Sequence, residues 1–205
     1  MNVPARALKS FQMLQHKVEF ISIVNFVKDH FKKLKKLNQR ARFIHELVDE
    51  HNKEVFDHPL VQQLSPCKLG CVGCCYTQVS VTKDEAELLA EKIMNGLEVD
   101  LERLKIQASV GTNSESYYKI PYSDRRCLFL SEENHCRIYE DRPSVCRTNA
   151  VLGTPDQCDT SVSIKPTRLV LTEKADMAIY ASFLLSDRNG TLPQMVYEVI
   201  SQKKT

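Results

Sequence analysis

The chain has 205 residues, of which 42% are hydrophobic, so it is long enough to form a globular domain with an ordinary core and needs no covalent cross-links merely to fold. Its formal net charge of +2 at pH 7 gives no indication of a nucleic acid or another highly charged partner. The eight cysteines all lie between positions 67 and 158, so any chemistry that depends on thiols is confined to the middle of the chain.

Residues 1–62 contain no cysteine and are predicted to form an N-terminal helical arm. Apolar residues recur there at helical spacing, which places them on one face of a helix. The first apolar stripe consists of Phe20, Val24, Val27, Phe31 and Leu34, and a second run of Phe43, Ile44, Leu47 and Val48. Two interpretations remain open. The stripe packs in the core of its own chain, or the arm contacts a second copy or another protein in the manner of a coiled coil.

Residues 63–165 hold all the cysteines, and a short strand followed by a helix is predicted inside this segment. The alternation over Gln78–Thr82 is typical of a strand. A capping box follows, because the Thr82 hydroxyl can accept the backbone N–H of Glu85 while the Glu85 side chain reaches back to the N–H of Thr82. Gly96 stands where the left-handed C-terminal cap of the helix is expected.

The rest of the chain adds helices and one strand. Residues 97–108 are predicted to be helical and residues 111–126 to form a polar loop. Residues 166–205 are predicted to pack on the same domain, with a strand at Arg168–Thr172 and helices at Glu173–Ser186 and Pro193–Ser201. The expected fold is mainly α with a few short strands (small α+β), in which helices surround an irregular cysteine-rich metal core.

The N-terminus lacks the apolar core of a secretory signal, and the apolar segment Phe20–Val27 is too short to span a bilayer. These features predict a cytoplasmic protein without a membrane span. Thiols stay reduced in the cytoplasm, and clustered reduced thiols more often bind metal than form disulfides. We therefore interpret the cysteines as metal ligands.

The first cysteine group is a dense local run with the sequence Cys-Lys-Leu-Gly-Cys-Val-Gly-Cys-Cys. Its cysteines are Cys67, Cys71, Cys74 and Cys75. Thiolates this close in the chain can converge on one centre without closing a large loop, so little entropy is lost. The two glycines of the run let the backbone turn around a metal and bring N–H groups towards the sulfurs.

The adjacent pair Cys74 and Cys75 does not suit a single zinc ion, whose ligands are usually separated by two to four residues. Three explanations are open: one of the pair serves a second metal ion, one bridges two ions, or one is a packed or reactive thiol. We favour the first two, which both predict more than one metal ion.

The second cysteine group is spread more widely and must be brought to the first by folding. It consists of Cys127, Cys136, Cys146 and Cys158. Four arginines stand near these cysteines, namely Arg126, Arg137, Arg142 and Arg147. Their charge either lowers the pKa of the thiols and offsets a thiolate-rich centre, or forms salt bridges with the acidic residues nearby.

These two groups together resemble the cysteine-cluster proteins of the YkgJ type, a family described as zinc- or iron-chelating domains. The family has a Cys-x-x-Cys-Gly-x-Cys-Cys run, then a Cys-x-Phe-Leu-like segment, then Cys-x-Ile-Tyr-x-x-Arg-Pro-x-x-Cys-Arg. Here Cys127–Leu130 corresponds to the second element and Cys136–Arg147 to the third, and the resemblance covers about residues 63–160. The chain departs from the first element, with three residues between Cys67 and Cys71, and with Val72 in place of glycine.

The resemblance implies a domain that chelates zinc or iron, and the iron could be held as an iron–sulfur cluster. It also implies a link to larger relatives that are flagellin lysine methylases with an iron–sulfur cluster and S-adenosylmethionine. Three functions follow: a non-enzymatic metal-binding protein, which we favour; an iron–sulfur enzyme or redox protein; and an adaptor whose metal braces a surface for a partner. All three use the same eight cysteines as ligands.

Overall fold

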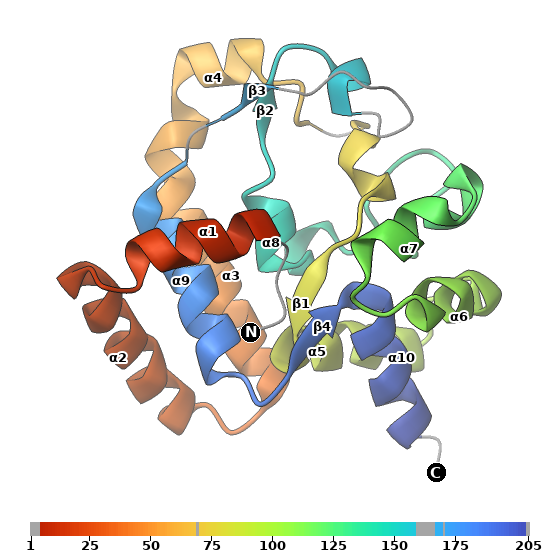
Figure 1. The fold of residues 1–205 in the computed structure, drawn as a ribbon, viewed down its shortest axis with the longest axis horizontal. Helices are drawn as coiled ribbons and strands as arrows, with labels where there is room; N and C mark the ends of the chain where they lie inside the picture. Colours follow the sequence, from red (N-terminus) through yellow and green to blue (C-terminus); the bar gives the residue numbers. More distant parts are fainter. Residues whose placement is uncertain (1–4, 69, 159–166, 170, 204–205) are drawn as a thin grey trace.

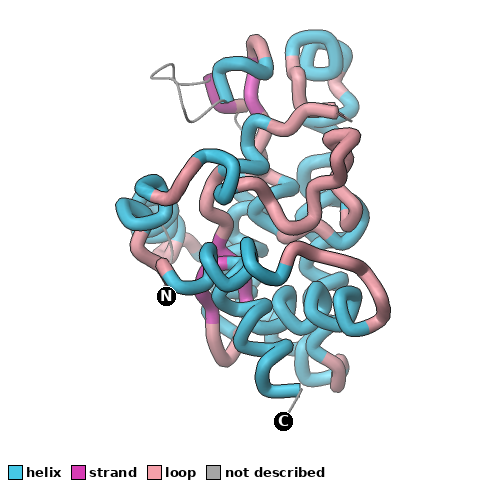
Figure 2. Tube along the Cα trace, turned by 90° about the vertical axis from the view of Figure 1, so that its right-hand side faces the viewer, coloured by secondary structure: helices cyan, strands magenta, loops and turns pink. Residues whose placement is uncertain are grey.

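A computed structural model describes residues 5–203 except 69, 159–166 and 170. Its helices and strands begin and end as follows. The α-helices are α1 (Ala5–Leu14), α2 (Val18–Lys33), α3 (Leu37–Asp57), α4 (Pro59–Leu64), α5 (Lys83–Met94), α6 (Leu101–Ser109), α7 (Ser114–Lys119), α8 (Ser144–Arg147), α9 (Glu173–Leu185) and α10 (Leu192–Lys203). The 3₁₀ helices are η1 (Gly73–Tyr76), η2 (Tyr122–Arg125), η3 (Tyr139–Asp141) and η4 (Pro155–Cys158). The strands are β1 (Ser80–Thr82), β2 (Val151–Leu152), β3 (Thr167–Arg168) and β4 (Asn189–Thr191). The fold is therefore mainly α with a few short strands, as the sequence predicted (Figures 1 and 2).

The helices form two packed groups with β1 and β4 between them (Figure 1). On one side α9 packs against α2 and α3, and on the other α10 packs against α5 and α6 (Figure 1). The two groups meet where α3 packs against α5. The apolar cores follow this division, with Phe129 and Leu89 buried in the α5–α10 core, and Val27 and Ile44 in the α2–α3–α9 core.

The apolar stripe of α2 is used inside the chain. Phe20, Val27 and Phe31 are buried, and the clusters that contain them include residues of α9. Packing within the chain therefore accounts for the stripe. The residues on which a coiled-coil contact with a second copy depended are already covered by α9 and give that contact no support.

The capping box at the start of α5 is confirmed. The Glu85 backbone N–H donates to Thr82 Oγ1 at 3.2 Å, and the Thr82 N–H donates to Glu85 Oε2 at 3.0 Å. Gly96 has the expected left-handed conformation, with φ of +102°. No helix in the described part of the chain is long and apolar enough to cross a membrane.

The pairing of the strands differs from the expectation. Strand β1 is shorter than predicted and pairs antiparallel with β4, with Val81 opposite Gly190, in a segment that the sequence had placed between helices. The strand expected at Arg168–Thr172 is reduced to β3, which pairs with β2, and Val170 lies outside the described residues. Gly190 allows this arrangement, because a Cβ there would lie 3.1 Å from the Met195 side chain of α10.

The segment 111–126, expected to be a polar loop, contains α7 and η2. Asn113 starts α7, since its side chain accepts the backbone N–H of Ser116 at 3.0 Å. A helix this short shows no clear apolar period in the sequence, which explains the wrong expectation. Its Tyr117 is buried, and the Tyr117 hydroxyl donates to the Arg125 carbonyl at 3.0 Å, so the segment is packed rather than loose.

Candidate metal centre

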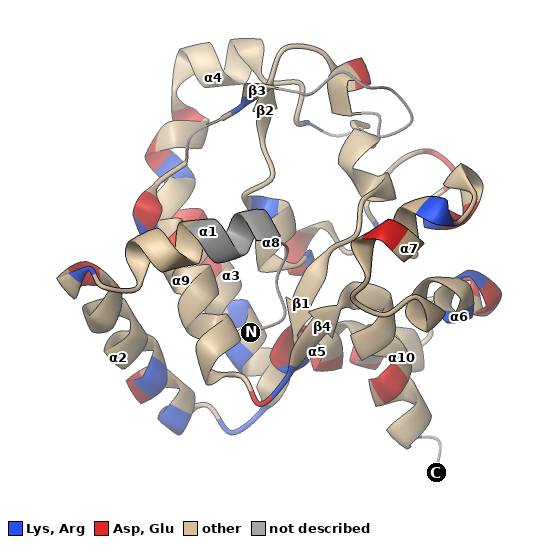
Figure 3. Ribbon diagram, in the orientation of Figure 1, with Lys and Arg blue, Asp and Glu red and all other residues tan. Residues whose placement is uncertain are grey.

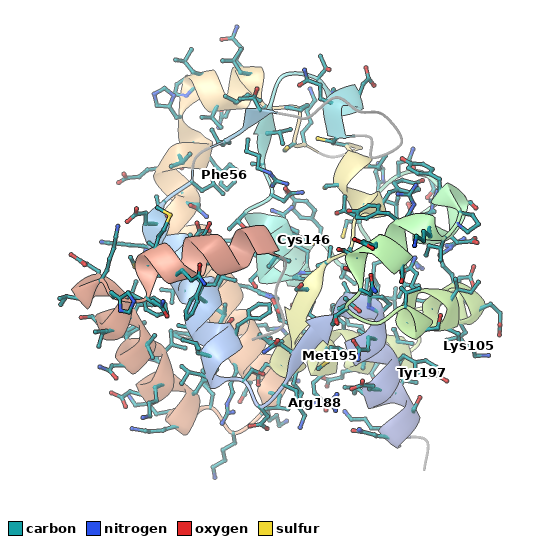
Figure 4. All side chains as sticks on the ribbon, in the orientation of Figure 1. Phe56, Lys105, Cys146, Arg188, Met195 and Tyr197 are labelled. Carbon is teal, nitrogen blue, oxygen red and sulfur yellow. The ribbon has the colours of Figure 1, made fainter. Side chains whose placement is uncertain are left out.

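The eight cysteines lie on separate short elements that the fold brings together, and all are free thiols. Cys67 and Cys71 lie before η1, Cys74 and Cys75 on η1, Cys127 after η2, Cys136 opposite Leu130 in a β-bridge, Cys146 on α8 and Cys158 at the end of η4. Figure 4 labels Cys146 near the middle of the molecule. The two cysteine groups, far apart in the sequence, therefore meet in the fold.

Most of these thiols surround one cavity of about 150 Å³. The cysteines that line it are Cys67, Cys71, Cys74, Cys75, Cys127, Cys136 and Cys146. Apolar side chains complete its wall, among them Phe129, Ile138 and Leu192. A thiol-rich cavity that apolar residues line in part is a suitable site for a soft or borderline metal, because such residues reduce access of water to the sulfurs.

Cys158 lies close to η1. A Cβ added to Gly73 would be only 2.4 Å from the Cβ of Cys158, so a side chain larger than hydrogen cannot stand at position 73 without moving η1 away from η4. The second glycine of the first cysteine run is thus required by this close approach. It lets Cys158 reach the first cysteine group.

The sulfurs in the loop before η1 receive backbone hydrogen bonds. The N–H of Val151 donates to the Cys67 sulfur at 3.4 Å, and the backbone of Gly73 makes a hydrogen bond to Cys71. The Cys75 N–H donates to the Val72 carbonyl at 2.8 Å and tightens the turn. Hydrogen bonds of this kind stabilise thiolate ligands by spreading their negative charge.

The second cysteine group is joined to the first through the backbone. The N–H of Cys127 donates to the Cys75 carbonyl at 2.8 Å. The sulfurs of Cys127 and Cys136 each receive a backbone hydrogen bond from the residue two positions later, Phe129 and Ile138. Cys71 and Gly73 show the same spacing, so the same local turn recurs at three of the cysteines.

Cys74 and Cys75 ionise very differently. A hydrogen bond from the Cys75 thiol is the main reason why the pKa of Cys74 is lowered to about 6, and the Asn149 side chain and the charge of Arg142 contribute. The same hydrogen bond, together with burial, raises the pKa of Cys75. In the chain without metal, Cys74 is therefore the thiolate of the pair and Cys75 its donor.

Three further thiols resist ionisation. Burial raises the pKa of Cys127 to about 11 and that of Cys158 to about 11, and it raises the pKa of Cys146 well above the ordinary value. Thiolate charges add to the effect, from Cys67 and Cys71 at Cys158. A bound cation reverses this balance, because a coordinating thiol loses its proton.

The four arginines divide between the two predicted roles. Burial raises the pKa of Cys136, and the charges of Arg142 and Arg137 partly offset that rise. The charge of Arg142 also helps to lower the pKa of Cys74. Arg126 lies 3.7 Å from Glu132 in a salt bridge, and Arg147 forms one with Asp49. Two of the arginines thus offset the charge of the thiolates, and the other two form ion pairs.

Outside the metal centre, positively and negatively charged side chains are both spread over the helices (Figure 3).

Asn149 is a site residue that the sequence did not indicate. Its side chain hydrogen-bonds to the Cys74 thiol and accepts a hydrogen bond from Arg168 Nη1 at 2.5 Å. Asn149 lines the thiol cavity and also a larger neighbouring cavity of about 810 Å³, to which Cys74 and Cys146 are exposed as well. A single asparagine near a cysteine has no recognisable spacing, so only the fold identifies it.

The thiols surround a space rather than a point. Within the described residues, no three His, Cys, Asp or Glu side chains converge in a geometry that would hold one metal ion. The donor set nevertheless fits a metal, because it consists of thiols that receive backbone hydrogen bonds and lie next to arginine charge. Cys67, Cys71, Cys74 and Cys75 are the residues through which the local run would bind it, with Cys127, Cys136, Cys146 and Cys158 completing the set.

Comparison with known proteins agrees with this chemistry. A family model described as "CxxCxxCC: Putative zinc- or iron-chelating domain" matches residues 66–162, which include the elements from η1 to η4 and all eight cysteines. No curated protein and no solved structure matches the chain. Over residues 66–162 the chain is therefore similar to the CxxCxxCC family of zinc- or iron-chelating domains.

Proposed function

We propose that this protein chelates zinc or iron in a thiolate centre that contains more than one metal ion. The observation that carries the proposal is the cavity of about 150 Å³ lined by Cys67, Cys71, Cys74, Cys75, Cys127, Cys136 and Cys146. Metal binding itself agrees with the family of the domain. The number of ions rests on the size of the cavity and the number of thiols around it.

The cavity is too large for a single ion. Sulfur ligands lie about 2.3 Å from zinc, and four of them close around it without leaving room for a water molecule. A cavity of about 10–15 Å³ is enough to hold one water molecule. The thiol cavity is several times larger, and the cysteines around it outnumber the four ligands that one tetrahedral ion takes. A centre of several atoms accounts for both facts.

The position of Cys74 supports a bridging role. The residue before Cys74, Gly73, lies close to Cys158. The residue after it, Cys75, accepts a hydrogen bond from the Cys127 N–H. Cys74 stands between these two contacts and lines both cavities. A thiolate in this position is suited to hold two ions at once.

Thiolate ligands suit zinc and iron–sulfur clusters alike, so the donor set does not choose between them. The deciding experiment is to purify the chain without oxygen and to measure zinc, iron and acid-labile sulfide per chain, together with the visible spectrum. We expect at least two metal ions per chain. Zinc without sulfide identifies a zinc centre. Matched iron and sulfide, with a brown colour that bleaches on reduction, identify a cluster. One ion per chain contradicts a polynuclear centre, and no metal contradicts chelation.

The larger cavity favours a second candidate, an iron–sulfur enzyme or redox protein. Its volume of about 810 Å³ lies in the range of small-molecule sites, and Cys74 and Cys146 form part of its wall. A centre exposed on this side is accessible to a substrate or redox partner. If the purified chain contains iron and sulfide, a reversible reduction of the cluster supports this function, whereas zinc alone excludes the cluster on which it depends.

We also propose that the protein acts in the cytoplasm. The support is that all eight cysteines are free thiols, which persist in a reducing compartment.

A further inference from the structure

Cys146 is carried by α8, which has only four residues. A single helical turn is not stable in water by itself, because the cost of forming the first turn exceeds the gain from its hydrogen bonds. Something outside α8 must therefore fix its orientation. Two charged side chains do so, Glu85 at its first residue and Arg147 at its last.

Glu85 holds the start of α8. Its Oε1 accepts the backbone N–H of Ser144 at 2.7 Å and lies 3.2 Å from His45 Nε2. Its Oε2 accepts the N–H of Thr82 at 3.0 Å and lies 3.3 Å from Thr82 Oγ1. One carboxylate thus connects α3, the start of α5 and the start of α8.

This arrangement exceeds what a helix cap requires. A capping box uses one glutamate oxygen and normally lies on the surface, whereas Glu85 is only 2% exposed and His45 only 3%. Burying a carboxylate is costly unless several donors satisfy it. The second oxygen of Glu85 contacts both His45 of α3 and the Ser144 N–H, so it connects the start of α8 to α3.

Arg147 holds the end of α8. Its side chain is 5% exposed, and it donates through Nη1 to Asp49 of α3 and through Nη2 to the Glu140 carbonyl. Its Nε donates to the Arg142 carbonyl at 3.0 Å. The guanidinium therefore fixes the backbone that enters α8 against α3.

We propose that Glu85 and Arg147 are positioning residues that direct the Cys146 thiol into the thiol cavity before metal arrives. The inference rests on the proposed function, since it assigns these residues to a metal ligand. Residues that orient a ligand from outside the centre commonly change metal affinity by about 10- to 100-fold when they are replaced. Neither residue touches the metal in this proposal. Both act through α8.

The test uses two conservative variants of the full chain, Glu85→Gln and Arg147→Lys. Glu85→Gln replaces one carboxylate oxygen by an N–H₂ group, which faces groups that are themselves donors. Arg147→Lys keeps the positive charge but loses the planar guanidinium that donates to three acceptors. We expect each variant to remain helical by circular dichroism but to bind zinc at least about 10-fold more weakly in competition with a chromophoric chelator. The cobalt-loaded variants should also show a weaker sulfur-to-metal charge-transfer band.

The matched control is Asp100→Ala, which removes a carboxylate that accepts the Arg103 N–H at 2.9 Å at the exposed start of α6. It should lower the melting temperature and leave zinc affinity and the cobalt spectrum unchanged. If Glu85→Gln and Arg147→Lys behave like this control, the two residues serve stability alone and the proposal is wrong.

The wild-type chain supplies a measurement that needs no variant. If α8 is positioned in advance, the hydrogen-bonded backbone amides of Ser144, Cys146 and Arg147 exchange slowly with solvent even after the metal has been removed. Fast exchange in the metal-free chain overturns the proposal, even where the variants fail to fold. Absence of metal binding by the wild-type chain is a different result, because it contradicts the proposed function while slow exchange of α8 would still be observed.

Discussion

Cys74 and Cys75 are adjacent in the chain, but their thiols have opposite tendencies to ionise. Cys74 receives hydrogen bonds from Cys75 and Asn149, whereas Cys75 is surrounded by other thiols that disfavour a further negative charge. The pair therefore contains one thiolate ready for a cation and one thiol that needs the cation before it releases its proton. This difference is a property of single residues and can be measured at that scale.

In the reduced, metal-free chain we expect Cys74 to be alkylated by iodoacetamide before the other cysteines. Its modification should increase as pH rises through about 6, because the thiolate predominates above this pKa. Modification of Cys127 and Cys158 should require pH near 11. Mass spectrometry of peptides at each pH gives the order.

Asn149→Ala removes a hydrogen bond from the Cys74 thiolate, so the midpoint for Cys74 should move to higher pH. Asn113→Ala, which affects only the start of α7, is the control and should leave the midpoint unchanged. A midpoint for wild-type Cys74 in the ordinary thiol range contradicts the proposed hydrogen bonds.

At the scale of elements, the centre depends on short helices held close to one another. Contacts between η1 and η4 bring Cys158 to the first cysteine run. The pairing of β1 with β4 brings the start of α10 next to β1, which follows that run in the chain. The Leu192 N–H donates to the Val79 carbonyl at 2.8 Å, and Leu192 lines the thiol cavity. The distances between elements therefore matter more here than the stability of any one of them.

Gly73→Ala tests the approach of η1 to η4. Since its Cβ would lie 2.4 Å from the Cys158 Cβ, we expect η4 to move away and metal bound per chain to fall, with the helical content unchanged. The control is Gly70→Ala, where φ is +89° but no atom lies within 4 Å of the added Cβ. That variant should lose stability through backbone strain alone and keep its metal. Equal metal content in Gly73→Ala and the wild type contradicts the expected displacement of Cys158.

For the whole molecule, local patterns in the sequence were sufficient for some features and not for others. The helical class, the capping box at Thr82 and Glu85 and the left-handed Gly96 depend on neighbouring residues and were predicted correctly. The β1–β4 pairing depends on contacts between distant segments, and the sequence pattern contains no information about them. The roles of Asn149 and of the second oxygen of Glu85 were missed for the same reason.

The cysteine ligand set itself stays a prediction, since the thiols line a cavity without closing on one point. What the fold adds is a common location for the two cysteine groups. It also adds a reason for Gly73 and a division of the arginines into those near thiols and those in ion pairs. None of these follows from spacing along the chain.

The apolar cores indicate what happens when metal is removed from the whole chain. Leu89, Phe129 and Val196 are buried in one core and Val27, Ile44 and Ala178 in the other, and none of these contacts requires a metal. We expect a chelator to lower the melting temperature while far-ultraviolet circular dichroism stays close to that of the loaded chain. Proteolysis should become faster around residues 66–77, 127–143 and 148–158, while α8 stays protected. Complete unfolding on chelation, as in classical zinc fingers, would contradict this expectation.

The spacing of the two cysteine groups has a consequence for the order of events during folding. The first run is local, so Cys67, Cys71, Cys74 and Cys75 can meet a metal ion almost as soon as the chain collapses, whereas contacts between distant segments form later. An ion captured early would be held by an incomplete set and exposed to water. In a chain that folds with an ion already captured, docking of α8 by Glu85 and of α10 through Val79 would then complete the set and enclose the ion, whereas in a chain that folds without metal the same contacts place Cys146 before metal arrives. Kinetic selection between metals would occur in that interval, before the cavity has its final walls.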